Sequence, residues 1–232
     1  MLCYPVGVEY VRSHWAFRQL AGHLAGKGYH VFRFDYYGTG DSAGEFEQAD
    51  ISCWLENIEL AAAEFRHMAN WQQLSLVGLR LGATLGLLAS ERLALNQLVM
   101  WDPVIDGKAY INTLAEMHET LKSNPDYIPA GSRGSFHFRD DEMIGYIFNA
   151  QLRDQIRALD LSKAQPERIN QTTLITTGNH ASVASLAGEL SERCGSIGHE
   201  SINGDMTLDL VGEIDEAYLP ANSIQFINGI FD

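Results

Sequence analysis

The feature that most constrains the fold is a five-residue turn between an apolar strand and an apolar helix. Leu74 to Val77 predicts a buried strand, and Ala83 to Leu93 predicts a helix that follows almost at once. The residues between them read Gly-Leu-Arg-Leu-Gly, from Gly78 to Gly82. Glycine at both ends permits a strained backbone and close packing of the helix on the strand. A strand that turns directly into a helix is typical of a parallel sheet covered by helices.

The rest of the chain alternates in the same manner. Further strands are predicted near Leu2 and at His30–Asp35, Leu98–Trp101, Thr173–Thr177 and Glu200–Ile202, and further helices at Ser13–Lys27, Ala49–Met68, Val183–Arg193 and Ala221–Ile230. This order predicts an α/β fold, a mainly parallel sheet with helices on both faces. Residues from about Ile105 to Gln171 break the alternation and are mostly helical or irregular. We expect a single domain over 1–232, with a helical cap inserted at about 105–171.

Composition narrows the function classes. The chain has 232 residues, 46% of them hydrophobic, which suffices for a sizeable core. A formal net charge of -14 opposes binding to nucleic acid or to an anionic membrane surface, and no apolar stretch reaches the roughly 18 residues that cross a bilayer. The three cysteines, Cys3, Cys53 and Cys194, have no metal-ligand spacing and are typical of reduced thiols. With no targeting signal after Met1, we expect a cytoplasmic protein without metal or cofactor.

Two further segments give the turn its context. Asp35 to Ser42 reads Asp-Tyr-Tyr-Gly-Thr-Gly-Asp-Ser, and Pro5-Val6-Gly7 follows the first strand. With the turn at Gly78 to Gly82, this set resembles the α/β-hydrolases from their third strand onward. The resemblance implies that the turn is the nucleophile elbow, that Asp35 to Ser42 is the D-x-x-G-x-G-x-S turn after the fourth strand, and that Pro5 to Gly7 is the oxyanion loop.

A narrower resemblance rests on scattered residues. They are Pro5, Glu9 and Ser13, the Gly-Leu-Arg-Leu-Gly-Ala turn at Gly78 to Ala83, and Trp101, Pro103, Gly107 and Lys108. This combination is similar to the group called exosortase A system-associated hydrolase 2. That resemblance implies a bacterial setting concerned with surface or exported polysaccharide.

The resemblance also implies two strands before the one near Leu2, and the sequence has no residues for them. Either the natural start lies upstream of Met1 or the sheet is shorter. In both cases we expect the Leu2 strand to form an edge of the sheet with unpaired backbone groups. A protein partner or a second copy of the chain would cover that edge.

The catalytic residues of the hydrolases are missing from their expected places. Arg80 stands at the centre of the elbow, and a guanidinium stays protonated at ordinary pH and cannot attack a carbonyl. The acid is expected shortly after Gly178, where the sequence reads Asn-His-Ala-Ser. The base is expected near Gly204-Asp205-Met206, and no histidine follows His199. Because the three roles act only as a unit, elbow hydrolysis is not expected.

Arg80 has three readings. In the first, it forms a structural ion pair with Glu9 or, as second choice, with Asp102. In the second, it strengthens an anion site at the start of the elbow helix. In the third, it belongs to an unexpected catalytic arrangement. The candidate pocket residues are Arg80, Leu81, Val6, Glu9 and Asp102, with a small anionic or acyl ligand. The first functional hypothesis is a catalytically degenerate binding or assembly component. The alternative is an active hydrolase or acyl transferase on esters or thioesters, using a nonstandard set such as Asp102 with a cap histidine.

Overall fold

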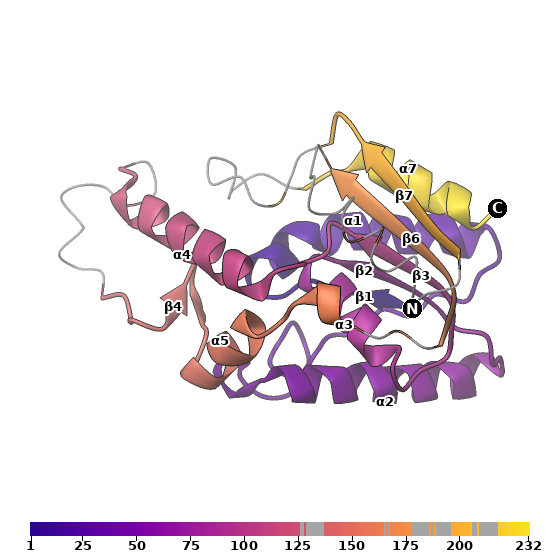
Figure 1. Ribbon diagram of the computed structural model, residues 1–232, viewed down its shortest axis with the longest axis horizontal. Coiled ribbons are helices and arrows are strands. Elements are labelled where there is room, and N and C mark those ends of the chain that lie inside the picture. Colours follow the sequence, from indigo (N-terminus) through magenta and orange to yellow (C-terminus); the bar gives the residue numbers. More distant parts are fainter. Residues whose placement is uncertain are drawn as a thin grey trace.

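The computed structural model describes residues 1–125, 128, 137–164, 166, 168–177, 186, 188, 196–205, 208 and 218–232. A five-stranded parallel sheet runs through the centre (Figure 1). Its strands, in spatial order, are β1 (Leu2–Cys3), β2 (Ser75–Leu79), β3 (Leu95–Trp101), β6 (Ile169–Thr177) and β7 (Ser196–Ile202). Every pair in this sheet is parallel, with Val77 opposite Val99 and Trp101 opposite Ile175.

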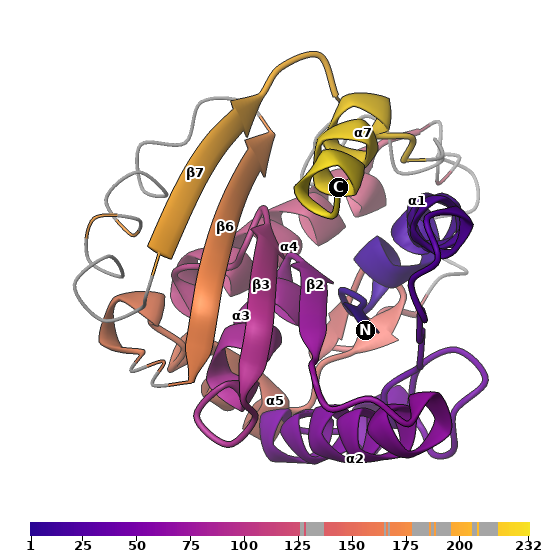
Figure 2. The same ribbon diagram turned by 90° about the vertical axis from the view of Figure 1, so that its right-hand side faces the viewer.

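Helices cover both faces of the sheet, as predicted. On one face lie α1 (Val8–Gly26) and α7 (Ala221–Ile230), side by side; on the other lie α2 (Ile51–Ala69) and α3 (Leu81–Ala89) (Figures 1 and 2). Local chemistry sets the ends of α2: Asp50 accepts a hydrogen bond from the Cys53 N–H at its start, and Asn70 takes the left-handed conformation at its end. The prediction of an α/β fold is confirmed.

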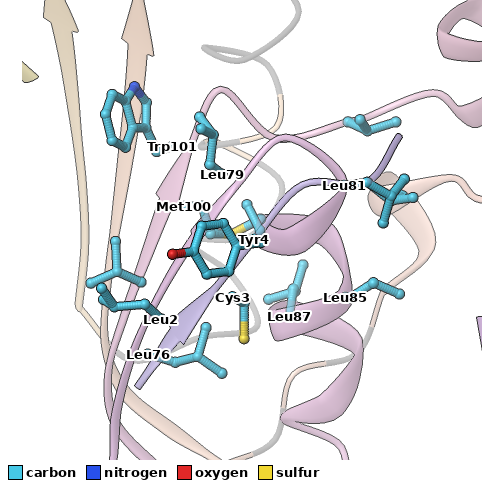
Figure 3. Packing of buried hydrophobic residues seen from close by; sticks show 14 of the residues in the cluster. Leu2, Cys3, Tyr4, Leu76, Leu79, Leu81, Leu85, Leu87, Met100 and Trp101 are labelled. Atoms are coloured by element: carbon cyan, nitrogen blue, oxygen red, sulfur yellow. The ribbon is translucent and has the colours of Figure 1, made fainter. Parts of the chain in front are cut away.

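The core forms where α3 packs on the short central strands. Leu81, Leu85 and Leu87 extend from α3, while Leu2 and Leu76 extend from β1 and β2 (Figure 3). All of these side chains are buried. Because α3 lies between the sheet and α2, it is apolar on all sides, in contrast with the amphipathic α2.

The segment predicted as a cap begins with α4 (Gly107–Ser123), which extends beyond the end of the sheet (Figure 1). It continues through β4 (Glu142–Met143), β5 (Tyr146–Ile147), α5 (Ala150–Arg157) and a 3-10 turn at Leu161–Lys163. The two helices fit the prediction of a helical or irregular segment. The antiparallel β4–β5 hairpin is additional, because two-residue strands are too short to show a period in sequence.

β1 is the end strand of the five-stranded sheet, as predicted, but the prediction that it is an exposed edge is wrong. Leu2 is only 1% exposed, pairs with Val77 on one side, and on the other makes a parallel bridge to Arg33, where its N–H donates to the Phe32 carbonyl at 2.9 Å. The segment at His30–Asp35 therefore lies outside β1, so no partner chain is needed to cover β1. That segment makes one bridge rather than the predicted strand, because β1 is only two residues long. The predicted helix at Val183–Arg193 falls largely outside the described residues.

Candidate functional site

The elbow turn has the strained backbone that the sequence predicts. Arg80 is the N-cap of α3 with φ 52° and ψ -123°, in the region that glycine favours. Its N–H donates to the Trp101 carbonyl at 2.9 Å, which ties the turn to β3. A side chain on Gly82 would collide with the carbonyl oxygens of Cys3 and Tyr4. Gly82 thus allows α3 to start directly against β1, and this contact holds Arg80 at the tip of the turn.

Arg80 forms the predicted ion pair with Glu9. Its Nε lies 2.9 Å from Glu9 Oε1, and the two side chains are 18% and 3% exposed. The other carboxylate oxygen accepts a hydrogen bond from the Tyr110 hydroxyl at 2.8 Å. The guanidinium carbon of Arg80 also lies 5.6 Å from the centre of the Tyr110 ring. Three segments distant in sequence, at the starts of α1, α3 and α4, meet in this cluster.

The charge of the cluster keeps Tyr110 protonated. Burial raises the pKa of its hydroxyl well above the usual range, and the Glu9 carboxylate adds to this rise while Arg80 opposes it. A phenol in this state can only donate to Glu9. The carboxylate thus has a charged donor on one oxygen and a neutral donor on the other, the pairing that a buried charge needs.

Asp102 follows β3 in a strained conformation of its own, with φ 43°. Its Oδ1 accepts from the Thr177 N–H and its Oδ2 from the Thr177 hydroxyl, both at 2.6 Å. The carboxylate therefore joins the end of β3 to the end of the neighbouring strand β6. Glu9, the first choice that the sequence predicts, is bonded to Arg80.

The remaining pocket candidates, Val6 and Leu81, have buried side chains that belong to the core. Within the described part of the chain, neither of their backbone N–H groups donates a hydrogen bond. The amide of Leu81 is at the N-terminus of α3, where the helix dipole is positive, and Val6 precedes Gly7, which has φ 61° and caps α1. A ligand role for these five residues stays a prediction.

A cavity of about 510 Å³ lies elsewhere, near the amino ends of β2 and β3. Its walls include Leu2, Tyr29, Phe65, Trp71 and Gln97. None of the predicted pocket residues lines it, because they lie at the opposite, carboxyl ends of the strands. The cavity is therefore separate from the elbow site.

Of the positions expected for the acid and the base, the structure describes only part of the second. The stretch from Asn179 to Ser182 falls outside the described residues. At the other position, the Asp205 carboxylate accepts from the N–H groups of Asn222 (3.1 Å) and Ser223 (2.7 Å), and so caps α7. Among the residues that the structure describes, no three His, Cys, Asp or Glu side chains are grouped to hold a metal ion.

Comparison with known proteins identifies the family. The family model described as serine aminopeptidase, S33, matches residues 10–196, well over half of the chain. The chain belongs to this family of α/β-hydrolases. No curated protein matches the sequence. In the described part of the S33 chain, no helix is both long and apolar enough to cross a membrane.

Solved structures of hydrolases share the fold. The S33 chain is similar to the esterase Est1E from Butyrivibrio proteoclasticus, solved with ferulic acid (TM-score 0.62, 14% identity, 99% of this chain and 84% of that one). It is also similar to the Pyrococcus furiosus esterase Pf2001 (TM-score 0.63, 11% identity, 98% of this chain and 79% of that one). A third similar structure is a proline iminopeptidase-related protein from Thermus thermophilus (0.62, 15%, 99% and 86%). At these identities the likeness shows the fold alone.

Two partners in this site are missing from the predicted set. Tyr110 holds Glu9, and Thr177 holds Asp102. Tyr110 lies one turn into α4, for which the sequence predicts no bounds, whereas Thr177 is the last residue of β6, as the predicted strand Thr173–Thr177 has it. The place of Thr177 at the end of one predicted strand, and of Asp102 directly after another, is the one signal that could have found this contact.

Proposed function

We propose that this S33 chain is a catalytically inactive α/β-hydrolase that acts as a binding or assembly component and takes a small anionic or acyl ligand at the elbow. The observation that carries the proposal is the ion pair between Arg80 and Glu9 at the tip of the elbow. In an active hydrolase this tip presents the nucleophile. Here it presents a protonated guanidinium, which has no electron pair to form an acyl intermediate.

Three features support an anion as the ligand. Arg80 supplies a positive charge that is mostly withdrawn from water. The N-terminus of the nine-residue helix α3 supplies a positive dipole end. The amides of Val6 and Leu81 make no hydrogen bond within the described chain. A carboxylate or phosphate that competes with Glu9 for the guanidinium would complete this set.

Ligand titration tests the binding part of the proposal. We expect acetate, succinate or inorganic phosphate to bind the wild-type chain in calorimetry, and Arg80→Gln to weaken that binding at least about tenfold, the loss of one charge-assisted contact. Arg92→Gln is the matched control, because Arg92 also pairs with a glutamate, Glu59, but on the surface. Equal and negligible binding by wild type and Arg80→Gln would leave Arg80 as a structural plug.

The alternative of an active hydrolase or acyl transferase is favoured by one observation, the strained elbow backbone that persists without a nucleophile. A fluorophosphonate probe separates the two functions. We expect no covalent labelling of the chain and no turnover of p-nitrophenyl esters. Labelling, or ester turnover that survives Arg80→Gln, would overturn the inactive assignment and place the chemistry at another group, with Asp102 the first to replace by Asn.

The biological setting is part of the same proposal. The resemblance to exosortase A system-associated hydrolase 2 supports a cytoplasmic role beside bacterial polysaccharide export. Exosortase and polysaccharide-synthesis genes next to the gene for this chain would support that setting, and their absence would count against it. Association with a protein partner or a second copy is measured by light scattering of the purified chain.

A further inference from the structure

The β4–β5 hairpin turns through a strained residue. Its register, with Met143 opposite Tyr146, leaves a two-residue turn of Ile144 (φ 50°) and Gly145 (φ 80°). Two positive φ values give the turn type that matches the twist of a hairpin. Glycine adopts this conformation freely, whereas a β-branched residue such as Ile144 is strongly disfavoured there. Other contacts must therefore hold Ile144 in place.

One of those contacts comes from a buried histidine of α4. The N–H of Ile144 donates to His118 Nδ1 at 3.1 Å, and His118 is only 5% exposed. Nδ1 can accept this bond only while it carries no proton, so the bond needs the neutral ring with its proton on Nε2. The Ile144 side chain is buried as well, which anchors the turn against the cap.

The same hairpin connects the cap with the loop beside the elbow. Phe46 packs edge-on against the rings of Tyr146 and Phe148, at centroid distances of 5.2 and 5.0 Å. A side-chain carbon on Gly7 would lie 3.5 Å from Phe148 and 3.8 Å from Tyr146, so both rings lie against the last residue of the Pro5–Gly7 loop. Movement of the hairpin would uncover this loop.

We propose that His118 is a pH-sensitive clasp: its neutral ring holds the strained Ile144 turn, and its protonation releases the β4–β5 hairpin from the loop beside the elbow. A proton on Nδ1 would face the Ile144 N–H with a second donor, so the hydrogen bond is lost and the strain of the turn is no longer offset. This device requires neither the anion site nor the inactive elbow, and it stands whether or not the proposed function is correct.

Among the described residues, charged and aromatic groups from α4, from β4 and from the segment before β4 face the ring. Lys122 and Glu119 come from α4 itself, Glu142 from β4, and Phe138 contacts the ring edge-on at 5.3 Å. Burial lowers the pKa of His118 below the usual 6.5, and Lys122 acts in the same direction, while Glu142 and Glu119 oppose both. The clasp is therefore closed at neutral pH and opens only at a pH below 6.5.

Amide hydrogen exchange, corrected for the intrinsic effect of pH, tests the clasp in the full chain. We expect the protection of the Ile144 amide to fall about tenfold between pH 7.5 and pH 5.0, the loss of one hydrogen bond and its partner. His118→Asn places a carbonyl oxygen where Nδ1 lies and cannot titrate, so its protection should stay the same at both pH values. His118→Phe keeps a ring but no acceptor, and its protection should be low at both.

Wild-type protection that does not change with pH, or an equal change in wild type and His118→Asn, would overturn the proposal. Should the variants not fold, the wild-type chain decides. The amide shift of Ile144 must then follow the titration of the His118 ring, measured in the same NMR series. Different midpoints for the two groups would also overturn the proposal.

Discussion

The elbow and the cap hairpin both place a residue other than glycine in the left-handed region, Arg80 at φ 52° and Ile144 at φ 50°, but they hold it by different means. At the elbow, a backbone hydrogen bond to Trp101, backbone packing at Gly82 and a buried ion pair act together. In the hairpin, the turn amide depends on one acceptor that can titrate. Strain that only fixed contacts hold is permanent, whereas strain that is held in part by a titratable side chain depends on pH.

The largest expected effect tests the packing of the elbow. Gly82→Ala should destabilise the fold by about 3 kcal/mol or more, since its new carbon meets backbone oxygens that cannot move alone. Gly22→Ala in α1 is the control, because nothing lies within 4 Å of that position and alanine favours a helix. Urea denaturation measures both. A small loss for Gly82→Ala would show that the elbow is less tightly constrained than its contacts indicate.

The next effect tests the ion pair. Glu9→Gln should lower the free energy of unfolding by about 2 kcal/mol or more, because it removes the carboxylate that pairs with the mostly buried charge of Arg80. Glu59→Gln removes the surface partner of Arg92 and should change the free energy of unfolding by no more than about 0.5 kcal/mol. Denaturation midpoints at neutral pH give both values. Similar losses for the two variants would remove the distinction between the elbow pair and a surface pair.

A smaller effect tests the link between the cap and the elbow. Tyr110→Phe should cost about 1.5 kcal/mol, the value of a hydrogen bond to a charged acceptor, without changing the core around the ring. Tyr37→Phe removes an exposed hydroxyl bond to Gln48 and should cost about 0.5 kcal/mol. Thermal unfolding of both variants measures the difference. No loss for Tyr110→Phe would mean that water replaces the hydroxyl at Glu9.

A glycine substitution in the hairpin should reduce the stability of the fold less than Gly82→Ala in the elbow. At Gly145 nothing lies within 4 Å, so Gly145→Ala adds backbone strain at φ 80° but no collision. We expect a loss of about 1 kcal/mol, read by urea denaturation. A loss as large as that of Gly82→Ala would erase the contrast between the two regions.

The smallest effect is the pH dependence of the clasp. Because burial lowers the pKa of His118 in the folded chain, the unfolded chain takes up the proton first as pH falls. The stability that the neutral ring contributes is therefore full above pH 6.5 and is lost below it. Relative to His118→Asn, wild type should lose up to about 1 kcal/mol between pH 7 and pH 5, measured by urea denaturation at each pH. Parallel pH profiles for the two proteins would contradict this assignment.

Much of the framework follows from local patterns. The predicted helix Ala221–Ile230 has the observed bounds of α7, and the predicted helix Ala49–Met68 differs from α2 by a residue or two. Both are marked by a helical period and by residues that end helices. The contact between Arg80 and Glu9 was also predictable, because a buried guanidinium needs a carboxylate and the loop that leads into α1 passes over the elbow.

The rest depends on contacts between distant segments. The sequence alone determined the alternating strands and helices, the tight elbow and the arginine at its tip, since each is a matter of neighbouring residues. Only the tertiary structure decided that Leu2 lies between β2 and Arg33, that Tyr110 reaches Glu9, and that His118 holds the turn at Ile144. A strand of two residues, such as β1, shows no period in the sequence. The partner of a side chain is fixed by packing between distant elements: Tyr110 and Glu9 are 101 residues apart, and His118 and Ile144 are 26 residues apart.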